Sequence, residues 1–329
     1  NISINAIGGW ADGLLKIDQG SLDHVSYPEP GRRLSTVLDN IDLSMHLAGK
    51  GTDYQLSSRW KREVGKDIAS GRLESNGTFV LSNNSTFESI QAEGSVQVEN
   101  AAGVFKGAKD LSANLLGNWT TKLLENFTAN FYLNGTPAGR IESRGKLDLV
   151  ENKWILNTAI NNVDRNVLNF LGSGKGLDFR DTVLNATNQI RLSPDAREWS
   201  VKGHITANKF SIIHNNAPSP PMELEADYDL EVNWLHKTAR LDRLTLDGIR
   251  GNDKVLDSRL VQPMQLDWAD NSSGVSESKL EIKLSEFDFA EWRPLLGGPI
   301  RAGDVNPASE CPPKVPRRFL KGSSKQKAL

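Results

Sequence analysis

Hydrophobic and polar residues alternate with a period of two along much of the chain, and the longest such stretch spans residues 222–234. A helix would distribute these apolar side chains around its circumference, whereas a strand places all of them on one face. At about 3.3 Å per residue this strand would be roughly 40 Å long, and ordinary strands have only about 5 to 6 residues. The apolar residues of the stretch are Met222, Leu224, Ala226, Tyr228, Leu230, Val232 and Trp234.

The same alternation recurs in shorter stretches between residues 41 and 284. Turn-forming residues such as Asn134-Gly135 separate many of them, so consecutive strands should pair antiparallel. One such pair is predicted on either side of a turn at Glu151-Asn152, with Leu149 still in the first strand. Five carboxylates and Asn233 fill the alternate positions of residues 222–234, which predicts a charged outer face that opposes self-association.

Helical patterns are scarce by comparison. Asp164 is a candidate N-cap for a short helix that ends at Gly172, and a second candidate helix runs from Asp288 to Leu296. The two segments resemble each other, which indicates an internal repeat near residues 163–172 and 287–298. We therefore predict an all-β protein with a few short helices.

The last 29 residues, 301–329, differ in character from the rest. They hold seven basic and two acidic side chains, a local charge of +5 in a chain of net charge −2, so residues 1–300 carry −7. Their prolines prevent regular structure, and we expect a basic, disordered tail after one elongated β domain at residues 1–300. The chain begins with Asn1 and shows no targeting segment, so we expect it to be a fragment of a longer protein.

Composition and motifs exclude several classes of function. No apolar stretch of about 18 residues is present to span a membrane, and the net charge of −2 argues against nucleic-acid binding. The single cysteine, Cys311, forms no internal disulfide and no CxxC zinc site, and the five histidines lack metal-ligand spacing. His204 is expected on the solvated face of a strand. No catalytic sequence motif is found, so we predict a protein that is not an enzyme, with no catalytic residues, metal site or cofactor.

A long sheet with one apolar face must hide that face from water. It can close as a barrel, pack as a sandwich, or curl into a groove that a ligand covers. A strand of about 13 residues is long for a compact sandwich, and few helices are available as a cover. Acyl chains suit such a groove because they offer apolar area without directional hydrogen bonds. We predict a long, curled antiparallel sheet that forms an extended apolar groove. Its expected lining residues are Met222, Leu224, Ala226, Tyr228, Leu230, Val232, Trp234, Leu280, Ile282 and Leu284.

Two segments, residues 162–171 (NVDRNVLNFL) and 287–296 (FDFAEWRPLL), resemble the AsmA-like proteins of Gram-negative bacteria, as does the order of long alternating strands. The resemblance implies a bent sheet of the β-taco type with an apolar channel, and no catalytic residues. It also implies a periplasmic body held by an inner-membrane anchor outside this sequence. The expected function is to bind or conduct phospholipid or other acyl lipids during outer-membrane biogenesis.

Two alternatives of other classes remain open at this point. The first is a surface β-sandwich or solenoid that binds glycans or proteins, and such a glycan binder should expose aromatic residues on a polar face. Here Trp60, Trp154, Trp199 and Trp234 are in phase with aliphatic residues, which favours the groove. The second is a β-rich glycoside hydrolase, which needs two convergent carboxylates that sequence alone does not identify.

Overall fold

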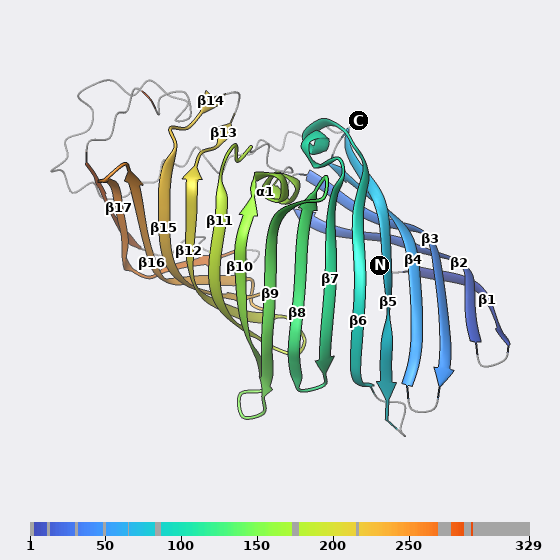
Figure 1. The fold of residues 1–329 in the computed structure, drawn as a ribbon. Helices are drawn as coiled ribbons and strands as arrows, with labels where there is room; N and C mark the ends of the chain where they lie inside the picture. The colour runs from blue at the N-terminus through green and yellow to red at the C-terminus, as the bar shows by residue number, and fades with distance from the viewer. Residues whose placement is uncertain are drawn as a thin grey trace, which may run out of the picture.

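The computed structural model shows one long antiparallel β-sheet that curls, with two short helices at one end of its strands (Figure 1). It describes residues 3–11, 14–29, 32–48, 51–64, 66–82, 87–172, 178–214, 217–268, 278–285 and Glu291, with side chains mainly from residue 51 onward. The predicted basic tail and most of the second predicted helix lie outside the described residues, although Glu291 is helical.

The first half of the sheet consists of nine strands. These are β1 (Ser3–Ala11), β2 (Leu14–Glu29), β3 (Arg32–Ala48), β4 (Gly51–Val64), β5 (Asp67–Leu81), β6 (Phe87–Ala101), β7 (Leu111–Thr120), β8 (Leu123–Leu133) and β9 (Thr136–Asp148). The second half, with a small hairpin of two strands, completes the fold. Its strands are β10 (Lys153–Asp164), β11 (Val183–Leu192), β12 (Glu198–Phe210), β13 (Ile213–His214), β14 (Ala217–Pro218), β15 (Met222–Asn233), β16 (Thr238–Arg250), β17 (Asp253–Gln262), β18 (Met264–Asp267) and β19 (Lys279–Leu284).

Strand pairing follows chain order almost throughout the 17-stranded sheet. Each strand from β1 to β12 pairs antiparallel with the next, and β12 continues to β15 because β13 and β14 form a separate hairpin. At the far end β17 and β18 both pair with β16, and β19 pairs with β17. Among the described strands no pairing joins the two ends, so the sheet is open. The all-β, antiparallel prediction is confirmed.

β-bulges interrupt the register of many strand pairs. Along β15 the alternation is continuous, whereas its partner β16 has an extra residue: Asp229 pairs with Arg243 and Leu230 pairs with Leu241, which leaves Asp242 between them. A bulge bends its strand and increases the local twist. The strands in Figure 1 bend accordingly, and the two ends of the sheet run in different directions.

One predicted strand end differs in the structure. Strand β9 ends at Asp148, and Leu149 lies in the following turn with 66% of its surface exposed. Asp148 Oδ1 accepts the backbone N–H groups of Val150 at 2.8 Å and Glu151 at 3.2 Å. These bonds, led by the one from Val150, lower the pKa of the Asp148 carboxyl. The side chain of Asp148 thus starts the turn before the alternation of the sequence ends.

The first predicted helix is present as α1 (Arg165–Gly172). Asp164 Oδ1 accepts the backbone N–H of Asn166 at 2.9 Å and that of Val167 at 3.4 Å, so it acts as the expected N-cap. A second, unpredicted element is the 3₁₀-helix η1 (Gly103–Ala108), which connects β6 to β7.

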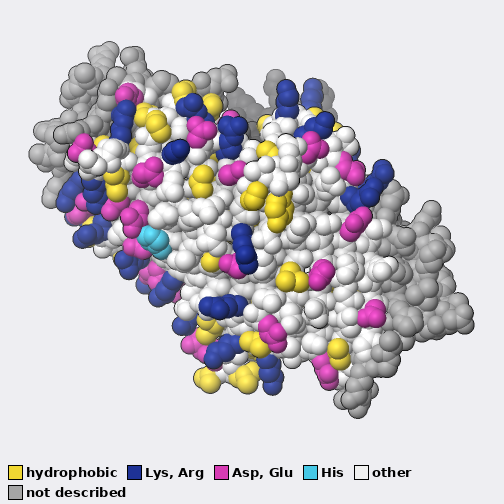
Figure 2. All heavy atoms as spheres, viewed as in Figure 1, with side chains coloured by type: hydrophobic (Ala, Val, Ile, Leu, Met, Phe, Trp, Pro, Cys, Tyr) yellow, Lys and Arg dark blue, Asp and Glu magenta, His cyan; other side chains and the backbone are white. Residues whose placement is uncertain are grey.

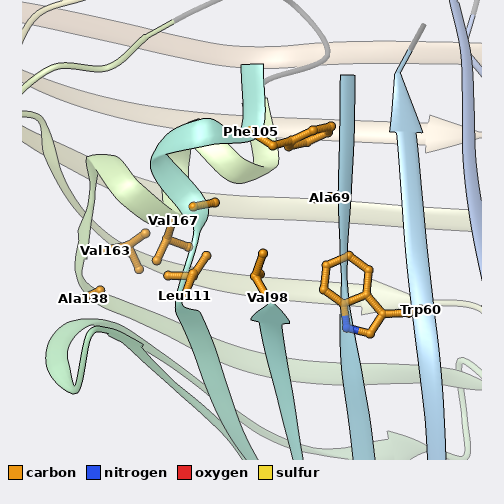
Figure 3. Close-up of a cluster of buried hydrophobic side chains, with 9 residues drawn as sticks. Trp60, Ala69, Val98, Phe105, Leu111, Ala138, Val163 and Val167 are labelled. Carbon is orange, nitrogen blue, oxygen red and sulfur yellow. The ribbon is translucent and has the colours of Figure 1, made fainter. Parts of the chain in front are cut away.

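The helices α1 and η1 form the most buried part of the molecule, packed on one face of the sheet (Figure 3). Phe105 of η1 and Val167 of α1 are each 1% exposed. The ring of Phe170 lies 5.7 Å from the ring of Phe105 and 6.2 Å from that of Trp60. The buried cluster consists of Trp60, Ala69, Val98, Phe105, Ala108, Leu111, Ala138, Val163 and Val167.

These ring contacts agree with a sheet that curls around the helices, as the ribbon does in Figure 1. Strand β4, which holds Trp60, is six positions from β10, a distance of about 29 Å in a flat sheet. The eight residues of α1 extend only about 12 Å from the end of β10, yet Phe170 reaches Trp60. The face that holds α1 and η1 is therefore the inner face of the curl.

We expect Asp164→Ala to lower the free energy of unfolding by about 1 kcal/mol, because two backbone N–H groups of α1 lose their acceptor. Chemical denaturation monitored by circular dichroism measures this change. The control is Asp181→Ala, which removes an exposed carboxylate 3.8 Å from Arg165 and should change stability by less than about 0.5 kcal/mol. Equal effects of the two substitutions would contradict the role of Asp164 as the cap.

Candidate functional site

Strand β15 is the centre of the candidate site and separates its side chains as the sequence predicts. Met222 and Val232 are buried, at 6% and 8% exposure, and the apolar residues between them are partly exposed. Trp234 follows directly after the strand and is 56% exposed. The intervening carboxylates lie on the opposite face.

The strand register aligns apolar residues of neighbouring strands with those of β15. On β12, Val201 pairs with Leu230 and Trp199 with Val232. The same row continues to Leu192 and then to Trp154, two and three strands from β15. An apolar face therefore extends across successive strands; we refer to this side of the sheet, which also holds α1 and η1, as the inner face.

The register also places the three predicted residues of β19 on the inner face. Leu284 pairs with Leu256, and Leu256 pairs with Gly248, which is paired with Leu224. Leu280, Ile282 and Leu284 are 45%, 56% and 37% exposed, so this end of the inner face is the more open one. The structure thus brings all ten sequence-predicted residues to one side of the sheet, with Trp234 at its margin.

Polar groups on the inner face are hydrogen-bonded to each other. The Tyr228 hydroxyl donates to Asn188 Oδ1 across Gly203, and the hydroxyls of Ser143 and Thr158 lie 3.0 Å apart. Gly203 is needed at this crossing, since a Cβ atom there would lie 2.1 Å from Asn188 Oδ1. Burial raises the pKa of Tyr228, so its hydroxyl remains a neutral donor at physiological pH. The alternating pattern gave no signal for this cross-strand bond.

Arg62 is a charged residue at the helical end of the inner face. Its guanidinium carbon lies 5.3 Å from the ring centre of Phe170 and 5.7 Å from that of Phe105. Both distances are within the range of cation–π attraction. The side chain therefore connects β4 to both α1 and η1, an arrangement that depends on the tertiary fold and that sequence analysis missed.

The outer face carries paired charges of both signs (Figure 2). Lys202 Nζ lies 2.9 Å from Asp229, and Arg243 lies 3.4 Å from Asp227. His204 Nδ1 lies 3.1 Å from the same Asp227 carboxylate, which confirms its predicted place on the face opposite Val201. Such exposed cross-strand pairs contribute little to stability individually but keep this face hydrated.

The described residues contain no group of His, Cys, Asp and Glu side chains that could hold a metal ion. No helix among the described residues has the length and hydrophobicity needed to cross a membrane. Comparisons of the chain with protein-family models, with curated proteins and with solved structures find no match.

Proposed function

We propose that this protein binds the acyl chains of phospholipids or other acyl lipids along the inner face of its curled sheet. The observation that carries the proposal is an extended row of large apolar side chains that remain partly exposed. Among the described residues, α1, η1 and the segment after α1 that holds Phe179 lie over this face, at one end of the strands. Soluble proteins rarely expose large contiguous apolar surfaces unless a ligand or partner covers them.

The chemistry of the inner face favours hydrocarbon over polar ligands. Its hydroxyl and amide groups bond to each other, as Tyr228 does with Asn188 and Ser143 with Thr158. A hydrocarbon chain needs no hydrogen bonds, and each buried CH₂ group contributes about 0.8 kcal/mol. Contacts with several strands would thus supply useful affinity without any specific polar recognition.

The resemblance of residues 162–171 and 287–296 to AsmA-like proteins supports a more specific role. We propose a periplasmic protein that is anchored in the inner membrane by a segment outside this sequence. Its groove would bind or conduct phospholipid and so contribute to outer-membrane biogenesis. In this role the protein is not an enzyme, and the inner face supplies a path rather than a reaction site.

Glycan binding is the competing function, because two tryptophans are exposed at the sheet margin. Trp234 and Trp268 are 56% and 41% exposed, and their rings meet edge to face at 5.7 Å. Both side chains, however, are in phase with the inner face. Trp234 lies two residues after Val232, and Trp268 lies two residues after Leu266. Leu266 pairs with Ala239, which in turn pairs with Val232. Their position in an apolar row favours lipid over sugar.

Native mass spectrometry of the purified protein tests the proposal. We expect bound masses that disappear after extraction with organic solvent and that reappear when the delipidated protein is incubated with phosphatidylethanolamine vesicles. Lipid analysis of the extract should identify the species carried. A lipid-free protein that fails to take up lipid from vesicles would contradict the proposed function, and binding to immobilised glycans instead would support the alternative.

A further inference from the structure

A small cavity lies beneath α1 on the inner face, with a volume of about 150 Å³. Leu168 of α1 and Phe179 of the following segment cover it from one side. Strands β11, β12, β15 and β16 form its other walls, where Leu184, Phe210 and Ala226 are among the lining residues. The cavity adjoins the buried cluster of α1 and η1 but is not filled by it.

The lining of this cavity is apolar. Its one polar residue, Thr182, uses its hydroxyl elsewhere: Oγ1 donates to the backbone carbonyl of Ser211 at 3.2 Å and accepts the N–H of Ser211 at 3.1 Å. The cavity is partly open, and its apolar volume of about 150 Å³ matches a hydrocarbon the size of benzene, roughly six carbons. The cavity can therefore hold one end of an aliphatic chain but not a charged headgroup.

The cavity is closed toward α1 and continuous with the rest of the inner face on β15. Asn169 Oδ1 accepts the backbone N–H of Phe179 at 2.8 Å, and its Nδ2 donates to Asp178 at 2.8 Å, so the covering segment is fixed to α1. In the other direction Ala226 is followed along the same face by Tyr228 and Leu230. A chain inserted here would extend away from α1.

We propose that this cavity holds the methyl end of a bound acyl chain, so that α1 sets the direction in which the chain lies along β15. The inference rests on the proposed function and specifies a binding site within it. The carboxyl end and headgroup then lie toward the Trp234 end of the strand, where the side chains are more exposed.

The test uses two photoreactive phosphatidylethanolamines, one with a diazirine at the last carbons of the acyl chain and one with a diazirine near the ester. Crosslinked positions are mapped by peptide mass spectrometry on the wild-type protein. We expect the terminal probe to label Leu168, Phe179 or Leu224, and the ester-proximal probe to label residues near Leu230 and Val232.

A variant that fills the cavity provides a second test of the chain-end site. Ala226→Phe places a ring in the cavity, so labelling of its walls by the terminal probe should fall about ten-fold. Ala239→Phe is the matched control, because Ala239 lies on the same face opposite Val232 but does not line the cavity. It should leave the terminal labelling of the cavity unchanged.

The outcomes separate this inference from the proposed function. Terminal labelling that is spread evenly along the face, or that concentrates near Trp234, would overturn the chain-end site and leave lipid binding intact. A wild-type protein that is labelled by neither probe would overturn both. Because the wild-type pattern is decisive by itself, the inference remains testable if Ala226→Phe does not fold.

Discussion

Leu230→Asp should remove most lipid crosslinking while the protein stays soluble and rich in β structure. Leu230 is partly exposed in the middle of the inner face, between Val201 of β12 and Leu241 of β16. A carboxylate among hydrocarbon chains is costly, and we expect labelling by photoreactive phosphatidylethanolamine to fall about ten-fold or more. Without lipid the carboxylate can reach water, so the far-UV circular dichroism spectrum should be unchanged.

The matched control for this substitution is on the same strand. Glu231 is exposed on the outer face, so Glu231→Ala changes the charge by one unit beside Leu230 without altering the inner face. It should retain wild-type labelling. Two results would contradict the prediction. Normal labelling of a folded Leu230→Asp protein would show that β15 does not line the lipid path. A free energy of unfolding lowered by several kcal/mol would indicate that Leu230 lies in a closed core.

The strand content could be predicted because alternation is a local property of the sequence. Residues 222–234 show it without interruption, and β15 begins at Met222 as expected and ends at Asn233, one residue before the predicted end. The bulge in β16 has a sequence signal too, since Leu241-Asp242-Arg243-Leu244 shifts the apolar phase by one residue. A count of the period across that stretch would have located the bend.

The covering of the inner face could not be predicted, because it depends on contacts between distant residues. Trp60 and Phe170 are 110 positions apart in the sequence, and their meeting depends on how the strands from β4 to β10 and α1 pack together. The helix η1 has no periodic pattern, and its N-cap residue, Ala102, offers no side-chain hydrogen bond. Nothing local in residues 103–108 therefore distinguished a helix from a loop.

The features of the candidate site can likewise be separated into those that local sequence patterns predict and those that depend on contacts between distant residues. The ten predicted residues share a face because register follows from alternation and short turns. The hydrogen bond between Tyr228 and Asn188, the aromatic contacts of Arg62 and the cavity beneath α1 each involve elements that only the tertiary fold brings together. The sequence therefore predicts an apolar surface, and the structure adds the features that could select and orient a ligand.

Phe105→Ala should destabilise the protein more than any other single truncation considered above, by about 3 to 5 kcal/mol. The Phe105 ring is 1% exposed, contacts Phe170 and lies beneath the Arg62 guanidinium. Its removal leaves a cavity between η1, α1 and the sheet and ends one cation–π contact. Denaturant titration should show a lower midpoint with little change in slope.

Phe87→Ala provides the matched control, because Phe87 is 37% exposed at the start of β6 and lies outside the buried cluster. It should cost about 1 kcal/mol or less, in line with partly exposed positions. If the two variants unfolded at the same denaturant concentration, η1 would not be packed against α1 and the sheet would lack its main anchoring cluster. A selective loss in Phe105→Ala would instead show that η1 and α1 pack together on the sheet and stabilise the inner face that we propose binds lipid.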